Sequence, residues 1–293
     1  MRKVFLGRDG LRAGWSLLIF FAVTVGLIVG LQNVAVRLPL LGAVLENPAN
    51  GDAGPEAGIL NEVIYNIAML VAMLVMARIE RRRVLDYGWA PNPGARLRLL
   101  LGFLLGIAMF SSMYFMQWLE HVYKVEGFAL NARAAFLYGT LWLVTCLLIG
   151  TFEEGVFRGY AQSRLGRAVG FWPAALIVSV VFGSVHMVDT NYHWMGTISA
   201  TMGGLFFCFC LWRTGDLWLA VGFHAAGDFT ELFVFAPAHS FRSAHHLLKA
   251  DSVGPAWLTG STIGPEASIH GYLLMAVAFV LVAALTRKAA LAK

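Results

Sequence analysis

The sequence predicts an all-α polytopic membrane protein, a bundle of about eight transmembrane helices. Of its 293 residues, 58% are hydrophobic and 13% are charged, and the mean hydropathy is +0.68. A soluble domain carries about 25% charged residues, so the composition excludes an ordinary water-soluble globule. The same numbers exclude a disordered chain, which needs low hydrophobicity and high charge. Three cysteines exclude a disulfide framework and a Cys-rich metal fold.

Eight apolar segments are long enough, to within a few residues, to span a membrane. A helix crosses a hydrocarbon core of about 30 Å with roughly 20 apolar residues. The first segment is too long for the apolar part of a signal peptide, so we interpret it as a retained span. No solenoid repeat or linker divides the chain, which predicts a single polytopic membrane domain over residues 1–293, with the motif-bearing helices at 136–236. The expected spans are residues 15–36, 59–77, 97–119, 136–158, 171–187, 194–212, 217–235 and 268–286, and the fourth helix continues to about Arg167.

The positions of Lys and Arg predict the orientation. The formal charge is +5, and most of the 22 Lys and Arg residues fall at the two termini and in the second, fourth and sixth loops. Positive residues concentrate on the cytoplasmic side of a membrane protein, so we expect an integral protein of the cytoplasmic (plasma) membrane with both termini in the cytoplasm. The basic residues flank the spans and form no nucleic-acid motif, which excludes nucleic acid as a partner.

Ionisable side chains cluster in the expected spans of the second half of the chain. Such residues cost several kcal/mol inside a membrane unless they are paired or face a cavity, so each one is a candidate for function. Spans one to three carry almost none apart from Glu62, which sits at a span start. We therefore expect spans one to three and eight to form a scaffold around a polar core. The candidates are Glu153, Glu154, Arg158, His186, His224, Asp228 and Glu231.

Spacing predicts that several of these side chains meet. Spans four and five form a hairpin that turns near residues 169–170, with Glu153 about 16 residues before the turn and His186 about 16 after it, at equal depth. His224 and Asp228 are four residues apart and share a helix face. Three helices can thus present one glutamate, two histidines and one aspartate to one buried pocket.

The two adjacent glutamates of the fourth span are expected to differ in role. Glu154 and Arg158 are four residues apart with the acid first, the favourable order for an ion pair. Glu153 points about 100° away on the helix and stays available as a general base toward water. A purely structural role for both acids is the alternative interpretation, as is an interfacial position for His186 and a simple hydrogen-bonding role for Asp228.

Other conspicuous residues favour packing over chemistry. Phe182 lies four residues before His186 and shares its face, which is typical of packing. The cysteines read as small core residues, and the glycines of the sixth span are typical of helix packing. The sequence contains no H-E-x-x-H, P-loop or G-x-S-x-G motif.

Three short motifs resemble the CPBP family of intramembrane proteases, also called the CAAX protease and bacteriocin-processing or Abi family, which includes the Ras-converting CAAX endoprotease. The family pattern is E-E-x-x-x-R, then F-x-x-x-H, then H-x-x-x-N or D. The chain reads EEGVFR at 153–158, FGSVH at 182–186 and HAAGD at 224–228. The resemblance covers roughly residues 149–228 and implies an eight-helix membrane bundle.

The resemblance also implies roles for the motif residues. Glu153 and His186 would activate the hydrolytic water, His224 with Asp228 would stabilise the oxyanion, and Glu154 and Arg158 would support the site. The prenyl-protein processing members of the family often have Asn at the position of Asp228. An ionised Asp only accepts hydrogen bonds, whereas an oxyanion needs a donor. Asp228 would therefore be protonated, orient His224 or ligate a metal. Glu, two His and Asp also form a donor set for a divalent metal such as zinc, so metalloprotease and metal-independent glutamate protease both stay open.

These observations predict an intramembrane endopeptidase that acts on hydrophobic or membrane-associated peptides or proteins, with membrane lipid around it. A secondary transporter or proton relay is the first alternative, because buried acids and histidines also mark such pathways. Against it, the chain shows no inverted halves or matched broken helices. A non-catalytic membrane scaffold or immunity protein of the same fold is the second alternative.

Overall fold

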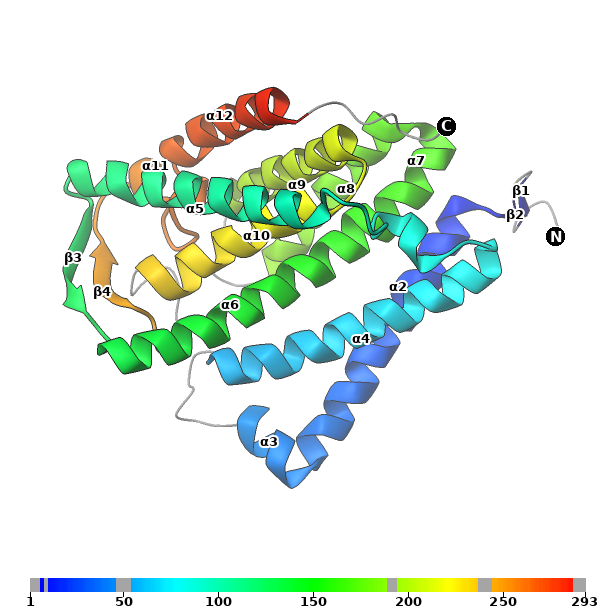
Figure 1. Ribbon diagram of the computed structural model, residues 1–293, viewed down its shortest axis with the longest axis horizontal. Helices are drawn as coiled ribbons and strands as arrows, with labels where there is room; N and C mark the ends of the chain where they lie inside the picture. The colour runs from blue at the N-terminus through cyan, green and yellow to red at the C-terminus, as the bar shows by residue number, and fades with distance from the viewer. Residues whose placement is uncertain (1–5, 8–9, 46–53, 189–193, 237–243, 287–293) are drawn as a thin grey trace.

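The chain folds into a helical bundle in the computed structural model (Figure 1). The structure describes residues 6–7, 10–45, 54–188, 194–236 and 244–286. Helices α2 to α12 make up most of it, and several are extended or linked by short 3-10 (η2, η4, η6) or π-helical (η3, η5) segments. The helical elements are α2 (Ala13–Arg37), α3 (Pro39–Leu45), α4 (Pro55–Glu80), η2 (Val84–Tyr87), α5 (Ala95–Leu119), α6 (Ala132–Glu154), η3 (Gly155–Gln162), α7 (Ser163–Val169), α8 (Phe171–Val185), η4 (His186–Val188), α9 (Trp194–Thr214), α10 (Trp218–Phe229), η5 (Thr230–Phe235), α11 (Ala256–Thr259), η6 (Pro265–Ala267) and α12 (Ile269–Leu285).

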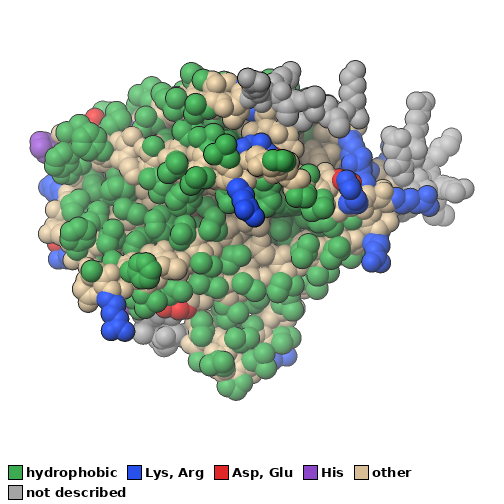
Figure 2. Space-filling view, viewed as in Figure 1, with side chains coloured by type: hydrophobic (Ala, Val, Ile, Leu, Met, Phe, Trp, Pro, Cys, Tyr) green, Lys and Arg blue, Asp and Glu red, His purple; other side chains and the backbone are tan. Residues whose placement is uncertain are grey.

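The predicted all-α membrane bundle is confirmed. Helical segments cover all eight regions expected to span the membrane. Within the described residues, five helices are long and apolar enough to cross a membrane: α2, α4, α5, α9 and the continuous run 132–169. α8 and α12 are shorter apolar helices, so the count of eight spans stays a prediction. Hydrophobic side chains cover most of the face in Figure 2, with Lys and Arg mainly toward its two ends, as expected for a protein surrounded by lipid.

The fourth span continues past its motif, as predicted. α6, η3 and α7 form one helical run over residues 132–169. The run ends at Gly170, whose φ of 88° lies in the left-handed region that favours glycine. α8 begins at the next residue, so the run and α8 form the expected hairpin. This hairpin carries the first two motifs.

Glycines let α10 pack against α5 at close range. A Cβ atom on Gly102 or Gly106 of α5 would overlap the α10 backbone, and one on Gly222 of α10 would overlap the Leu99 carbonyl of α5. Small residues of this kind let helix backbones approach closely in membranes, where packing and hydrogen bonds hold helices together. The close contact fixes α10, which carries the third motif.

Two short antiparallel sheets supplement the bundle, and the sequence did not indicate them. β1 (Leu6–Gly7) pairs with β2 (Gly10–Leu11), and β3 (Tyr123–Phe128) pairs with β4 (Leu248–Ser252) at the opposite end (Figure 1). The β3–β4 sheet joins the loop after α5 to the loop after η5. The loop at 236–267 is expected to be an interfacial lid; its residues 237–243 lie outside the described structure, and the rest contains β4, α11 and η6.

A buried acid at the end of α4 ties that helix to α7. Glu80 accepts a hydrogen bond from the Tyr160 hydroxyl at 2.9 Å and one from the Tyr87 hydroxyl at 3.2 Å. It also forms ion pairs with Arg164 at 3.1 Å and Arg167 at 3.4 Å. The side chains of Glu80 and Arg164 are 6% and 9% exposed, so the charges of this pair compensate each other away from water.

We expect Glu80→Gln to destabilise the protein by about 3–5 kcal/mol, because it leaves the buried Arg164 guanidinium without a countercharge. Thermal unfolding in detergent micelles measures the effect. The matched control is Asp86→Asn, which breaks the exposed Arg83–Asp86 pair and should cost less than about 1 kcal/mol. Hydrogen bonds from Arg83 hold the pKa of the Asp86 carboxyl below its usual range, so the control does remove a real interaction. Equal melting temperatures for the two variants would contradict a stabilising role for Glu80.

Candidate active site

The first motif places a fully buried ion pair where α6 meets η3. Arg158 Nη1 donates to Glu154 Oε1 at 3.0 Å, and both side chains are 0% exposed. The ion pair that the four-residue spacing predicts is therefore present. The pair forms although the helix changes from α to π geometry at Gly155, directly after Glu154.

His224 of α10 lies between three carboxyl groups. Its Nδ1 donates to Glu154 Oε1 at 3.0 Å. Its Nε2 lies 3.6 Å from Glu153 Oε2 and 3.8 Å from Asp228 Oδ2. Because an ionised carboxylate only accepts hydrogen bonds, the proton on Nδ1 belongs to the bond with Glu154. Nε2 is then the nitrogen that faces the other two acids.

Aromatic rings pack against His224 and the Arg158 guanidinium. The His224 ring stacks on Phe207 of α9, with centroids 4.9 Å apart and an interplanar angle of 10°. The Arg158 guanidinium lies 4.3 Å from the ring centroid of Phe182 on α8 and 5.2 Å from that of Phe207. Arg158 Nη2 has no hydrogen-bond partner within the described residues, so the ring faces supply part of its stabilisation. Phe182 is expected only to pack, yet it contacts the charge of the first motif.

His186, the histidine of the second motif, begins η4 directly after α8. Its Nδ1 donates to the Phe182 carbonyl at 2.7 Å, and its ring meets the Phe182 ring edge to face at 4.7 Å. Because a carbonyl oxygen only accepts, Nδ1 is the donor in this bond, which holds the His186 ring in place.

A small cavity with a mainly apolar lining and several ionisable side chains lies beside the motif residues. It has a volume of about 130 Å³. His186, His224 and Asp228 line it, together with Glu231 of η5 and Glu266 of η6. A cavity holds a water molecule once about 10–15 Å³ is accessible to it, so several waters fit here. The wall therefore combines histidines and carboxyl groups around room for water.

The structure thus connects five of the six expected site residues through the contacts of His224 and the ion pair, and it places the sixth, His186, on the wall of the same cavity. Glu153 and Glu154 diverge as expected: one approaches each side of the His224 ring. His186, His224 and Asp228 line this cavity, whereas Glu153 and Glu154 of α6 reach it only through their contacts with His224, so the meeting of all three helices at one pocket stays a prediction. Which chemical role each residue has stays a prediction.

Sequence reasoning missed two acids near the site. Glu62 of α4 has Glu153, Asp228 and His224 among its electrostatic neighbours. α4 begins at Pro55, so Glu62 lies two turns inside the helix and not at a span start. Glu266 lies in the loop before α12. Its sequence position did not indicate a functional role, because an acid just before an apolar helix is typical of a helix N-terminus.

The geometry does not favour a metal ion. Among the residues that the structure describes, no group of three or more His, Cys, Asp or Glu side chains is arranged to hold one. Glu154 is bonded to both Arg158 and His224 and offers no free lone pair toward the cavity on Oε1. A zinc ion at this site stays a prediction from the donor types.

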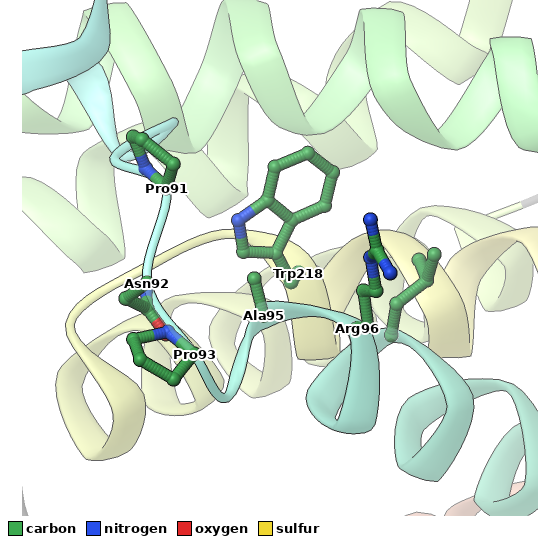
Figure 3. Close-up of a pocket in the computed structure, with 7 residues that line it drawn as sticks. Pro91, Asn92, Pro93, Ala95, Arg96 and Trp218 are labelled. Atoms are coloured by element: carbon green, nitrogen blue, oxygen red, sulfur yellow. The ribbon is translucent and has the colours of Figure 1, made fainter.

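A larger cavity of about 510 Å³ lies at the start of α10 (Figure 3). Its wall is mostly apolar, with the Trp218 ring over Ala95 and one basic side chain, Arg96. None of the six motif residues lines it. Three of the six motif residues, His186, His224 and Asp228, line the smaller cavity instead.

Comparison with known proteins agrees with the motifs. No curated protein matches the chain. One family model does match, over residues 134–230, which run from the first turn of α6 to the end of α10 and contain all six motif residues. The match confirms the resemblance to CAAX-type proteases that the three motifs carry. Over this segment the chain is similar to the family described as Type II CAAX prenyl endopeptidase Rce1-like.

Proposed function

We propose that the protein is an intramembrane endopeptidase that hydrolyses peptide bonds of hydrophobic or membrane-associated substrates. One observation carries the proposal: Glu154 binds one nitrogen of His224 while Glu153 and Asp228 approach the other, beside a cavity with room for water. The similarity to the CAAX endopeptidase family supports it. We also propose that the protein lies in the cytoplasmic membrane with both termini in the cytoplasm, because of the distribution of its Lys and Arg residues.

The proposed chemistry begins with a water molecule near Glu153. Glu153 accepts a proton from the water, and His186 Nε2 on the cavity wall forms a hydrogen bond with the same water. The water oxygen then attacks the carbonyl carbon of the substrate. The carbonyl oxygen becomes an oxyanion. The C–N bond then breaks, the proton held by Glu153 passes to the leaving amine, and the products are a carboxylic acid and an amine.

His224 is the proposed donor to the oxyanion. Its Nδ1 proton is engaged by Glu154, so a second proton on Nε2 gives an imidazolium whose Nε2–H can donate. Asp228, which accepts but does not donate when ionised, stabilises this positive charge from 3.8 Å. In this proposal the aspartate supports the donor and does not replace it.

Arg158 is proposed to position Glu154 and, through it, His224. Its side chain bonds Glu154 and is held between aromatic rings. Because no three-donor group forms within the described residues, no step of the proposed mechanism passes through a metal.

We expect Glu153→Gln to lower kcat for a quenched fluorescent hydrophobic peptide by roughly 10²–10⁴-fold, because the amide cannot accept the proton from water. His186→Gln should lower kcat as well, by a smaller factor. The matched control is Glu126→Gln, which changes an exposed acid paired with Lys249 on β4 and should keep full activity. Undiminished cleavage in both site variants would eliminate the mechanism, and ion flux in liposomes without hydrolysis would favour the transporter alternative.

Chelation separates the metal-free form of the proposal from the zinc form. We expect purified protein treated with 1,10-phenanthroline or EDTA to retain its peptidase activity, measured before and after removal of the chelator. A non-chelating phenanthroline isomer is the control for inhibition by the aromatic compound itself. Loss of activity that added Zn²⁺ restores would show that a metal takes part.

A further inference from the structure

Two carboxyl groups that the proposed mechanism does not use lie against each other on the cavity wall. Glu231 belongs to η5 and Glu266 to η6, and both line the cavity that His224 and Asp228 share. The two carboxyl groups are close enough to influence each other electrostatically. Glu231 is buried, with 7% of its surface exposed.

Nothing in the described residues balances this pair. No Lys, Arg or His in those ranges forms an ion pair with either carboxyl group, and the electrostatic neighbours of Glu231 are further acids, Glu266 and Asp228. The oxygens Glu231 Oε1 and Glu266 Oε2 are buried and accept no hydrogen bond from a donor in the described chain. Buried polar atoms are normally satisfied, so unsatisfied ones on a cavity wall point to a partner from outside the chain.

Hydrogen bonds from serine hydroxyls to backbone carbonyls fix the loop that carries Glu266. Ser199 of α9 donates to the Glu266 carbonyl at 2.8 Å, and the Ser268 hydroxyl donates to the Pro265 carbonyl at 2.6 Å while capping α12. Gly271 of α12 packs directly against this loop, because a Cβ atom at its position would overlap the Glu266 carbonyl. These contacts hold the backbone of the loop at Glu266 in place beside α9 and α12.

We propose that Glu231 and Glu266 form a binding subsite for a positively charged side chain of the substrate, Lys or Arg, close to the scissile bond. The inference rests on the proposed function. Glu231 is three residues beyond Asp228, about 4.5 Å along an ideal helix. A substrate Lys or Arg bound there would therefore lie within one or two residues of the cleaved bond. A cation here satisfies both orphaned oxygens and compensates the excess of acids around the cavity. An ammonium or guanidinium supplies several donors, which suits two adjacent carboxylates.

The test compares two quenched fluorescent peptides that differ only in Lys or norleucine at the residues flanking the cleaved bond. For the wild-type protein, kcat/KM should be roughly ten- to hundredfold higher for the Lys peptide, because a charged hydrogen-bonded pair is gained. Glu231→Gln and Glu266→Gln should each lower kcat/KM for the Lys peptide toward that of the norleucine peptide, which itself should change little. Glu126→Gln, with its exposed acid, should keep the full preference.

Two outcomes would overturn the subsite: equal cleavage of both peptides by the wild type, or variants that slow both peptides by the same factor. If the two amide variants do not fold, the wild-type preference decides. If the wild type cleaves neither peptide, the proposed function fails on its own. Binding of the two peptides to Glu153→Gln, which removes the proposed base and not the subsite, then tests the pair separately: tighter binding of the Lys peptide supports it, and equal binding refutes it.

Discussion

The ion pair of Glu154 and Arg158 is the constraint on which the rest of the site depends. Both side chains are fully buried, and removing one partner from such a pair leaves an uncompensated charge that costs about 3–5 kcal/mol. The surrounding structure meets this demand in specific ways. Glu154 also binds His224, and the free edge of the Arg158 guanidinium lies over Phe182 and Phe207. One buried charge therefore specifies contacts on four helices, α6, α8, α9 and α10.

Close helix packing makes these contacts geometrically possible. Gly204 of α9 leaves the space that Arg158 Nη2 occupies, and Gly222 lets α10 lie directly on α5. A larger side chain at either position would separate backbones or displace the guanidinium. The small residues expected merely to pack helices together therefore also set the distance between the charged groups and the cavity.

Periodicity allowed the helices, the hairpin at Gly170 and the Glu154–Arg158 pair to be predicted, because all three follow from local spacing. Contacts between segments distant in sequence were harder to predict. The bond from His224 to Glu154 depends on how α10 rotates about its own axis, which no local pattern fixes. Glu62 was placed at a span start because the beginning of α4 was set four residues late. Glu266 sits in a loop whose path depends on α9 and α12. The β3–β4 sheet was missed because its strands are short and 120 residues apart along the chain.

The π-helical stretch after Glu154 has a consequence for how this chain can vary. In η3 each turn holds more residues than in an α-helix, so eight consecutive positions, Gly155–Gln162, wind more slowly around the axis. Loss of one residue together with a return to α winding would change the rotation between Glu154 and α7 by less than the roughly 100° that one α-helical residue contributes, because the tighter winding makes up part of the lost rotation. The contacts of Tyr160 and Arg164 with Glu80 would therefore shift less than after a deletion in the α-helical part of the same run. A change of one residue in length is thus absorbed more readily in this segment than elsewhere in residues 132–169.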